Sequence, residues 1–144
     1  MDIYELLKTD HDKVKKLLSS LEKKKDNNLF EELKKEVILH NEAEEEAFYE
    51  PLQTKAGKLK IMVKAGHEEH DLVMQMMKQI NKVDDDEEWK KLLSVIKKSL
   101  EAHILMEEED IFDLSKKYFS AKEAKEMADN MGKIKDKMAK EYSE

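Results

Sequence analysis

Residues that break helices are almost absent from this chain, and their scarcity limits the folds available to it. Three glycines and one proline occur among 144 residues. Charged residues make up 42% of the sequence and hydrophobic residues 40%, and the apolar positions recur every three or four residues. This pattern is typical of helices with one apolar stripe and one solvated face. Since no segment shows the alternation of a strand, we predict an all-α protein.

Start signals and turn-forming residues divide the chain into helices. Capping-box patterns begin at Asp2, Asn28 and Ser120, where a side-chain oxygen can accept from the free N–H groups of a first helical turn. Four long helices with short connections predict an up-down-up-down four-helix bundle, in one domain over residues 1–144. A short fifth, C-terminal helix with a methionine-rich face should pack over the outside of the bundle. The predicted helices span residues 2–22, 29–50, 58–80, 87–116 and 121–140.

The composition excludes several classes of function. The formal net charge is −7 and every basic side chain is Lys, so no basic patch or Arg fork is available for phosphate, and we expect no nucleic-acid partner. The absence of Cys excludes disulfides, thiolate metal sites and thiol catalysis. No apolar run approaches the ~20 residues that span a bilayer, and the charged N-terminus does not resemble a secretory signal. We therefore expect a cytoplasmic protein without a membrane partner.

One unusual string occurs twice, about sixty residues apart. It reads HNEAEEEAF from His40 and HILMEEEDIF from His103, so that both copies contain H-x-x-x-E-E-E. Each copy follows a predicted helix that carries its own histidine, His11 or His70. The chain therefore looks like a duplicated unit, in which a histidine helix precedes an H-x-x-x-E helix.

All five histidines and two of the glutamates lie on predicted core-facing stripes. A single histidine on such a stripe is more often a structural core residue than a ligand, but here every helix of the bundle contributes one. Burying Glu44 and Glu107 without partners would be unfavourable by several kcal/mol each, and a cation between them would reverse that penalty. The candidate metal ligands are His11, His40, Glu44, His70, His103 and Glu107, with His67 as a possible fifth imidazole.

The spacing of these residues favours a site for two metal ions. Residues four apart on a helix point to the same side, so two packed halves place four imidazoles and two carboxylates around one cavity. This set is too large for one ion but suits two, and each glutamate is able to bridge them. Nitrogen and oxygen ligands without sulfur favour iron or manganese over structural zinc.

Taken in order, these motifs closely resemble the hemerythrin-like family, also called the HHE cation-binding domain. Its pattern is a histidine in helix 1, H-x-x-x-E in helix 2, an E-H pair in helix 3 and H-x-x-x-E in helix 4. The corresponding stretches here are TDHDKV, HNEAEEEAFY, HEEHD and HILMEEE. The resemblance implies a non-heme centre of two iron ions with two bridging carboxylates and an oxo or hydroxo bridge. Manganese or zinc are possible substitutes.

Two departures from the oxygen-carrying hemerythrins affect the ligand set. Those proteins have H-x-x-x-H in helix 3, whereas His67 and His70 are three residues apart. They also have H-x-x-x-x-D in helix 4, whereas this chain offers Glu107 at four residues from His103 and Glu108 at five. Glu107 lies closer to His103 around the helix, so we predict Glu107 as the ligand and keep Glu108 as the alternative.

The number of imidazoles decides between two kinds of chemistry. If His67 is a ligand, one coordination position stays open, which suits reversible end-on binding of O₂. If His67 instead pairs with Glu68 or Glu69, two positions stay open, which suits peroxide or NO chemistry or metal storage. We predict a protein that binds O₂ or a related diatomic molecule for storage, delivery or sensing, rather than an enzyme. The alternatives are an oxidoreductase that handles peroxide, NO or oxidative damage, and an iron or metal storage protein.

Overall fold

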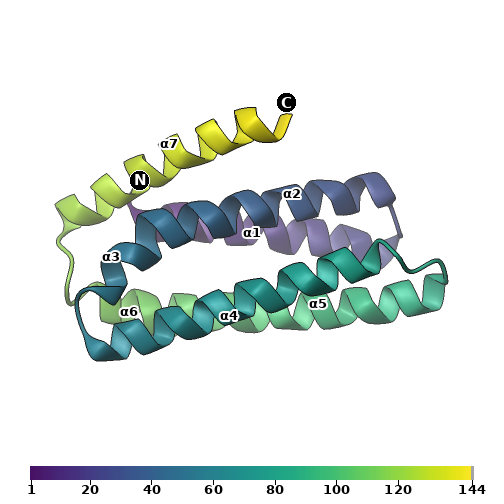
Figure 1. Ribbon diagram of the computed structural model, residues 1–144, viewed down its shortest axis with the longest axis horizontal. Coiled ribbons are helices and arrows are strands. Elements are labelled where there is room, and N and C mark those ends of the chain that lie inside the picture. The colour runs from purple at the N-terminus through teal and green to yellow at the C-terminus, as the bar shows by residue number, and fades with distance from the viewer. Residues whose placement is uncertain (144) are drawn as a thin grey trace.

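The helices of the bundle follow one another along the chain with short connections. The computed structural model describes residues 1–143. In Figure 1 the chain runs up and down through two neighbouring helical hairpins, and the last helix crosses the outer side of the first hairpin. The elements are α1 (Ile3–Lys23), α2 (Asn27–Glu44), η1 (Glu45–Tyr49), α3 (Glu50–Gln53), α4 (Gly57–Ile80), α5 (Asp86–Met106), η2 (Glu107–Ile111), α6 (Phe112–Ser115) and α7 (Ala121–Ser143). The prediction of an all-α bundle with an added C-terminal helix is therefore confirmed.

Side-chain caps set the helix starts. Asp2 and Glu5 form the predicted capping box at the start of α1, and Ser120 and Glu123 exchange the same pair of hydrogen bonds before α7. The expected box at Asn28 is wrong: the cap of α2 is Asp26, whose carboxylate accepts from the backbone N–H of Leu29. Asp26 caps better because its charge also complements the positive end of the helix dipole.

Two π-helical turns interrupt the second and fourth long helices, which we had predicted as continuous α-helices. The turn η1 follows the first H-x-x-x-E string, and η2 begins at the glutamate of the second. In a π turn each residue is followed one turn later by the residue five positions on, rather than four as in an α-helix. The second long helix also continues past its predicted end at residue 50, because Pro51 stands in the first turn of α3, where proline is tolerated.

The core is divided into two apolar clusters with the histidine layer between them. Near the N-terminus of α1 lies a cluster that includes Leu7, Phe48 and Met131. Nearer the other end lies a second cluster that includes Leu18 and Trp89. On each long helix the buried histidine lies between residues of the first cluster and residues of the second. The arrangement gives a polar layer sealed on both sides by apolar packing.

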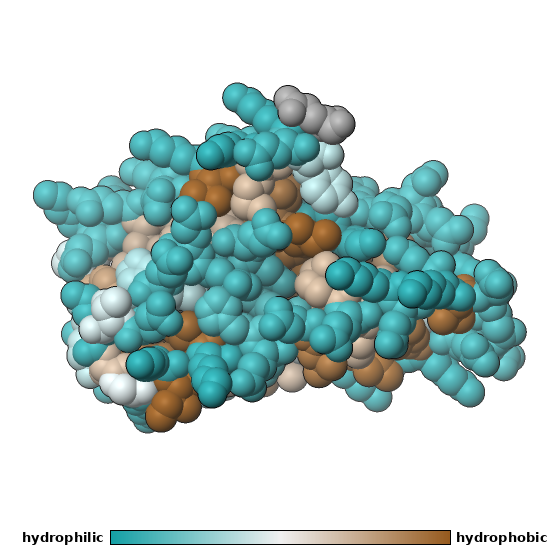
Figure 2. Space-filling view, in the orientation of Figure 1, coloured by the Kyte–Doolittle hydropathy of each residue, from teal (hydrophilic) through white to brown (hydrophobic). Residues whose placement is uncertain are grey.

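The helix α7 packs its methionine-rich face on the bundle, as predicted. Ala124, Met127 and Met131 are buried in the first cluster, and α7 contacts α1, α2 and η1. Figure 2 shows apolar side chains along the seam beneath α7, on a face that is otherwise mostly hydrophilic. Among the described residues, no helix combines the length and the apolar character needed to cross a membrane.

Candidate metal centre

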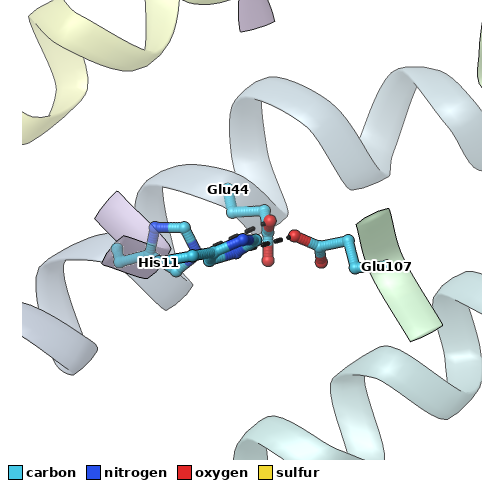
Figure 3. A group of neighbouring side chains, drawn as sticks. His11, Glu44 and Glu107 are labelled. Carbon is cyan, nitrogen blue, oxygen red and sulfur yellow. Dashed lines mark ion pairs between the residues drawn. The ribbon is translucent and has the colours of Figure 1, made fainter. Parts of the chain in front are cut away.

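Six side chains from four long helices converge in the polar layer. Glu44 and Glu107 are completely buried, at 0% exposure each. Figure 3 shows their carboxylates facing each other from separate helices, with the ring of His11 beside them. The six residues fall into two groups whose ligand atoms lie within 4.8 Å of one another. The groups are His11, His40, Glu44 and Glu107, and Glu44, His70 and His103.

Glu44 reaches the imidazoles of both halves of the duplicated unit. Its Oε1 lies 3.3 Å from Nε2 of His70, and its Oε2 lies 3.6 Å from Nε2 of His40. His40 belongs to the first half and His70 to the second. One carboxylate therefore offers one oxygen to each half, as a bridging ligand must.

Glu107 has the reciprocal arrangement. Its Oε1 lies 3.1 Å from Nε2 of His11, and its Oε2 lies 3.5 Å from Nε2 of His103. The hydroxyl of Tyr49 donates a 2.7 Å hydrogen bond to the same Oε2. With Glu44, this carboxylate gives two positions, one beside His11 and His40 and one beside the other two imidazoles.

Each of the four buried imidazoles turns Nε2 toward the centre and Nδ1 toward a carboxylate outside it. Such outer carboxylates fix the ring orientation of metal-binding histidines and raise the basicity of the inner nitrogen. We call these four acids the outer carboxylates. The pairs are His11 with Glu108 at 2.6 Å, His40 with Asp10 at 2.8 Å, His70 with Glu45 at 2.8 Å and His103 with Glu69 at 2.8 Å.

The outer carboxylates repeat the internal duplication. In the first half, Asp10 stands immediately before His11 and pairs with His40 of the same half. Glu45 stands immediately after the central glutamate and pairs with His70 of the other half. The second half has the same arrangement at the equivalent positions. Each half therefore orients one histidine of its own and one of its partner half.

The electrostatics of this layer hold protons on the His40 and His103 rings when no cation is present. Burial alone would lower the pKa of His40, but Glu44 and Asp10 outweigh it and raise this pKa to about 10. Burial is likewise outweighed at His103, where Glu107 and Glu69 raise the pKa to about 10. Burial opposes ionisation of Glu107 too, yet its imidazole partners hold the pKa of that carboxyl well below its usual range. The Glu107 carboxylate is thus charged and attracts positive charge.

The unpartnered polar atoms show that these residues fit metal ions. Within the described residues, five buried side-chain atoms have no hydrogen-bond partner, and all five lie in this layer. Buried polar atoms are otherwise almost always paired. These five atoms all face the centre, where cations would bind them. They are Nε2 of His11, Nε2 of His40, both carboxylate oxygens of Glu44 and Oε1 of Glu107.

Two predicted alternatives lie outside the central groups. His67 is not in either group; its side chain is 40% exposed, and its Nδ1 lies 2.9 Å from Oε1 of Glu45 rather than beside Glu68 or Glu69. Glu108 lies outside as well and pairs with Nδ1 of the His11 ring. Six of the seven predicted ligands therefore come together, and their role as ligands stays a prediction.

Several residues of the site were not anticipated from the sequence. The outer carboxylates Asp10, Glu45 and Glu69 were missed, although each is the immediate neighbour of a predicted ligand. Tyr49 is fully buried, and its hydroxyl also reaches Glu107. The Tyr49 ring stacks on the His70 ring, with centroids 5.5 Å apart and 9° between the planes. It occupies space left by Gly66, where an added Cβ would lie 2.6 Å from the hydroxyl oxygen.

A small cavity adjoins the imidazoles on the side of the second apolar cluster. Its volume is about 20 Å³, which is close to the space that one water molecule needs. Three site imidazoles and several aliphatic side chains surround it. The lining residues are His11, Val14, Val37, His40, Asn41, Leu100, His103 and Ile104.

The fold and the site together define a helical bundle that can bind cations through buried histidines and glutamates. Residues 2–115 match the family model of the hemerythrin HHE cation-binding domain. The chain belongs to this family. Its bundle resembles the crystal structure of a hemerythrin HHE cation-binding domain-containing protein from Mycobacterium kansasii, with a TM-score of 0.78 and 24% identity, over 95% of this chain and 89% of that one. Comparison with the curated proteins found no match.

Proposed function

We propose that the chain is a non-heme di-iron protein that binds O₂ or a related diatomic molecule next to its metal site. His11 and His40 would hold one ion, and His70 and His103 the other, with Glu44 and Glu107 bridging both. Four imidazoles and two carboxylates without sulfur match the ligand preferences of iron, whereas zinc usually takes four ligands. Two iron ions, when bound, supply electrons and open coordination positions for a small ligand.

The small cavity is the observation that carries this proposal. Its volume of about 20 Å³ is close to that of one water molecule, so it suits only the smallest ligands and excludes organic substrates. His11, His40 and His103 line it, so a molecule inside would lie next to both predicted metal positions. Val14 and Leu100 contribute apolar walls, which suit O₂ or NO better than a charged ligand.

The chain's own residues would orient the metal ligands and keep water away from the bound molecule. The outer carboxylates hold each imidazole with Nε2 inward, so the donor atoms need little reorganisation when ions bind. The two apolar clusters close the layer at both ends. These features support storage, delivery or sensing of a diatomic molecule. A cytoplasmic location remains our prediction.

Metal content and visible absorption test the proposal directly. We would load the purified protein with ferrous iron without oxygen, count iron per chain, and record spectra before and after O₂ is admitted and removed. We expect about two irons per chain and an absorption band that appears with O₂ and disappears on its removal. A colourless protein that retains zinc and takes up no iron would refute the proposal.

A second experiment tests the cavity. Val37→Ile adds one methylene group to the cavity wall, and we expect it to keep both irons while weakening the spectral response to O₂. Val73→Ile is the matched control, because Val73 is buried in the same apolar cluster but does not line the cavity. Equal spectral responses of the two variants to O₂ would show that the cavity is not where the ligand binds.

The position of His67 favours a second candidate, an oxidoreductase that consumes peroxide or NO. With His67 outside the two groups, the four central imidazoles would leave one open position on each iron. Neighbouring open positions suit a ligand that bridges two irons. Rapid consumption of hydrogen peroxide or NO by the iron-loaded protein, with irreversible oxidation by O₂, would favour this candidate over the first.

A further inference from the structure

The helix α7 contacts an outer carboxylate of the polar layer through a lysine side chain. The family match ends at residue 115, so α7 lies beyond the matched segment. Lys135 of α7 places its Nζ 2.7 Å from Oδ2 and 2.8 Å from Oδ1 of Asp10. The same Oδ2 lies 2.8 Å from Nδ1 of His40. A continuous chain of contacts therefore leads from α7 through Asp10 to a predicted metal ligand.

Asp10 differs from the other three outer carboxylates in its surroundings. Its side chain is 8% exposed, whereas the side chains of Glu108, Glu45 and Glu69 are 24%, 32% and 41% exposed. Within residues 1–143, Asp10 is also the one outer carboxylate that pairs with a lysine. Solvent can offset the charge of the more exposed acids, but Asp10 depends on protein partners.

Metal binding and Lys135 act on the same carboxylate. Nζ of Lys135 contacts both oxygens of Asp10, and one of these oxygens also pairs with Nδ1 of His40. An ion bound through Nε2 would fix the His40 ring, and the ring would then fix the Asp10 carboxylate through Nδ1. A carboxylate that is already fixed loses less freedom when Lys135 binds it. The contact between α7 and Asp10 should therefore be stronger when the site is loaded.

We propose that Lys135 is a positioning residue that couples the docking of α7 to metal occupancy, through Asp10 and His40. The inference rests on the proposed metal-binding function and adds a means of regulating it. Coupling between two binding equilibria is reciprocal. Docked α7 therefore strengthens metal binding by the same factor by which bound metal strengthens the docking of α7. Any factor that lifts α7 from the bundle would loosen the ion beside His40.

The test compares three substitutions on α7. Lys135→Met removes the charge and keeps most of the length, and Lys135→Arg restores the charge. Lys133→Met is the matched control, because Lys133 is exposed on the same helix. The affinity for Zn²⁺ is measured by competition with a coloured chelator. We expect Lys135→Met to weaken the binding of the zinc ion beside His40 about tenfold or more. The other two variants should bind zinc like the original protein.

Hydrogen exchange of α7 provides a second, independent measurement. Zinc should slow the exchange of α7 amides in the original protein, and this slowing should be lost in Lys135→Met. A purely structural lysine would instead change exchange equally with and without zinc, and would leave the affinity unchanged. Unchanged zinc affinity in Lys135→Met, or α7 exchange that is indifferent to zinc, overturns the coupling while leaving the metal site intact. An original protein that binds no metal overturns both the coupling and the proposed function.

Discussion

The hydroxyl of Tyr49 donates a hydrogen bond of 2.7 Å to Oε2 of Glu107, from one half of the duplicated site to the other. Tyr49 lies five residues after Glu44, and the residue five positions after Glu107 is Phe112. The second half therefore has no hydroxyl that could donate an equivalent hydrogen bond to Glu44. Both oxygens of Glu44 lack a hydrogen-bond partner among the described residues. The two carboxylates predicted to bridge the ions are thus chemically unequal despite the repeat in the sequence.

Removing this hydroxyl should affect both stability and metal binding. In Tyr49→Phe, a buried carboxylate loses its neutral donor, so we expect the free energy of unfolding of the metal-free protein to fall by about 1–2 kcal/mol. The affinity for Zn²⁺ should fall about tenfold, because Glu107 is less well oriented. Tyr4→Phe is the control, since Tyr4 bonds to Ser115 outside the site. Equal zinc affinities in the two variants would show that the Tyr49 hydroxyl has no influence on the site.

Gly66 makes room for the Tyr49 ring, which leads to a prediction opposite to the usual effect of alanine in a helix. Alanine is favoured over glycine in a helix interior by about 1 kcal/mol. In Gly66→Ala, however, the new Cβ would lie 3.0 Å from two ring carbons as well as 2.6 Å from the hydroxyl oxygen. Displacing a fully buried ring should lower the free energy of unfolding by about 1–3 kcal/mol.

The control for this prediction is Gly132→Ala in α7, where an added Cβ meets nothing within 4 Å. This variant should be more stable than the original protein, by up to about 1 kcal/mol. Urea denaturation of both variants provides the comparison. Similar shifts of the two midpoints in the same direction would show that the ring adjusts without penalty.

The helical periodicity was enough to predict the bundle and the six converging side chains. An i, i+4 pair on one helix faces one direction whatever its neighbours do, so His40 with Glu44 and His103 with Glu107 could be placed from spacing alone. Their convergence followed because every long helix had one apolar stripe, and a stripe must face the core.

The outer carboxylates could not be predicted in this way. The contact between Asp10 and His40 depends on the rotation and height of two different helices, which spacing within one helix does not determine. The π turns were missed for a related reason. A π turn has no characteristic residue that marks it in the sequence. Tertiary packing decides whether the residue one turn after Glu44 is Phe48, as in an α-helix, or Tyr49, as in a π-helix.

The raised pKa values of His40 and His103 predict how pH affects the metal-free protein. Both values move from 6.5 to about 10 on folding. Protonation of these rings therefore stabilises the folded state fully below about pH 6.5, and this stabilisation is lost as the pH rises toward 10. In the metal-loaded protein these rings would be neutral ligands, so their protonation would not make stability depend on pH. Urea midpoints should thus fall between pH 6.5 and 9.5 without metal and change less with zinc. Parallel pH profiles for the two forms would contradict this expectation.

The positions of His67 and His70 lead to a direct test of the ligand count. Both histidines lie on α4 and both contact Glu45, but only His70 has its Nε2 directed at Glu44. We expect His70→Ala to lose about one of two metal ions per chain and His67→Ala to retain both, because the exposed His67 is outside the central groups. Metal analysis after gel filtration, together with circular dichroism to verify folding, makes the comparison. Loss of an ion in His67→Ala would mean that its ring moves inward when metal binds, and would restore the five-imidazole site that suits end-on binding of O₂.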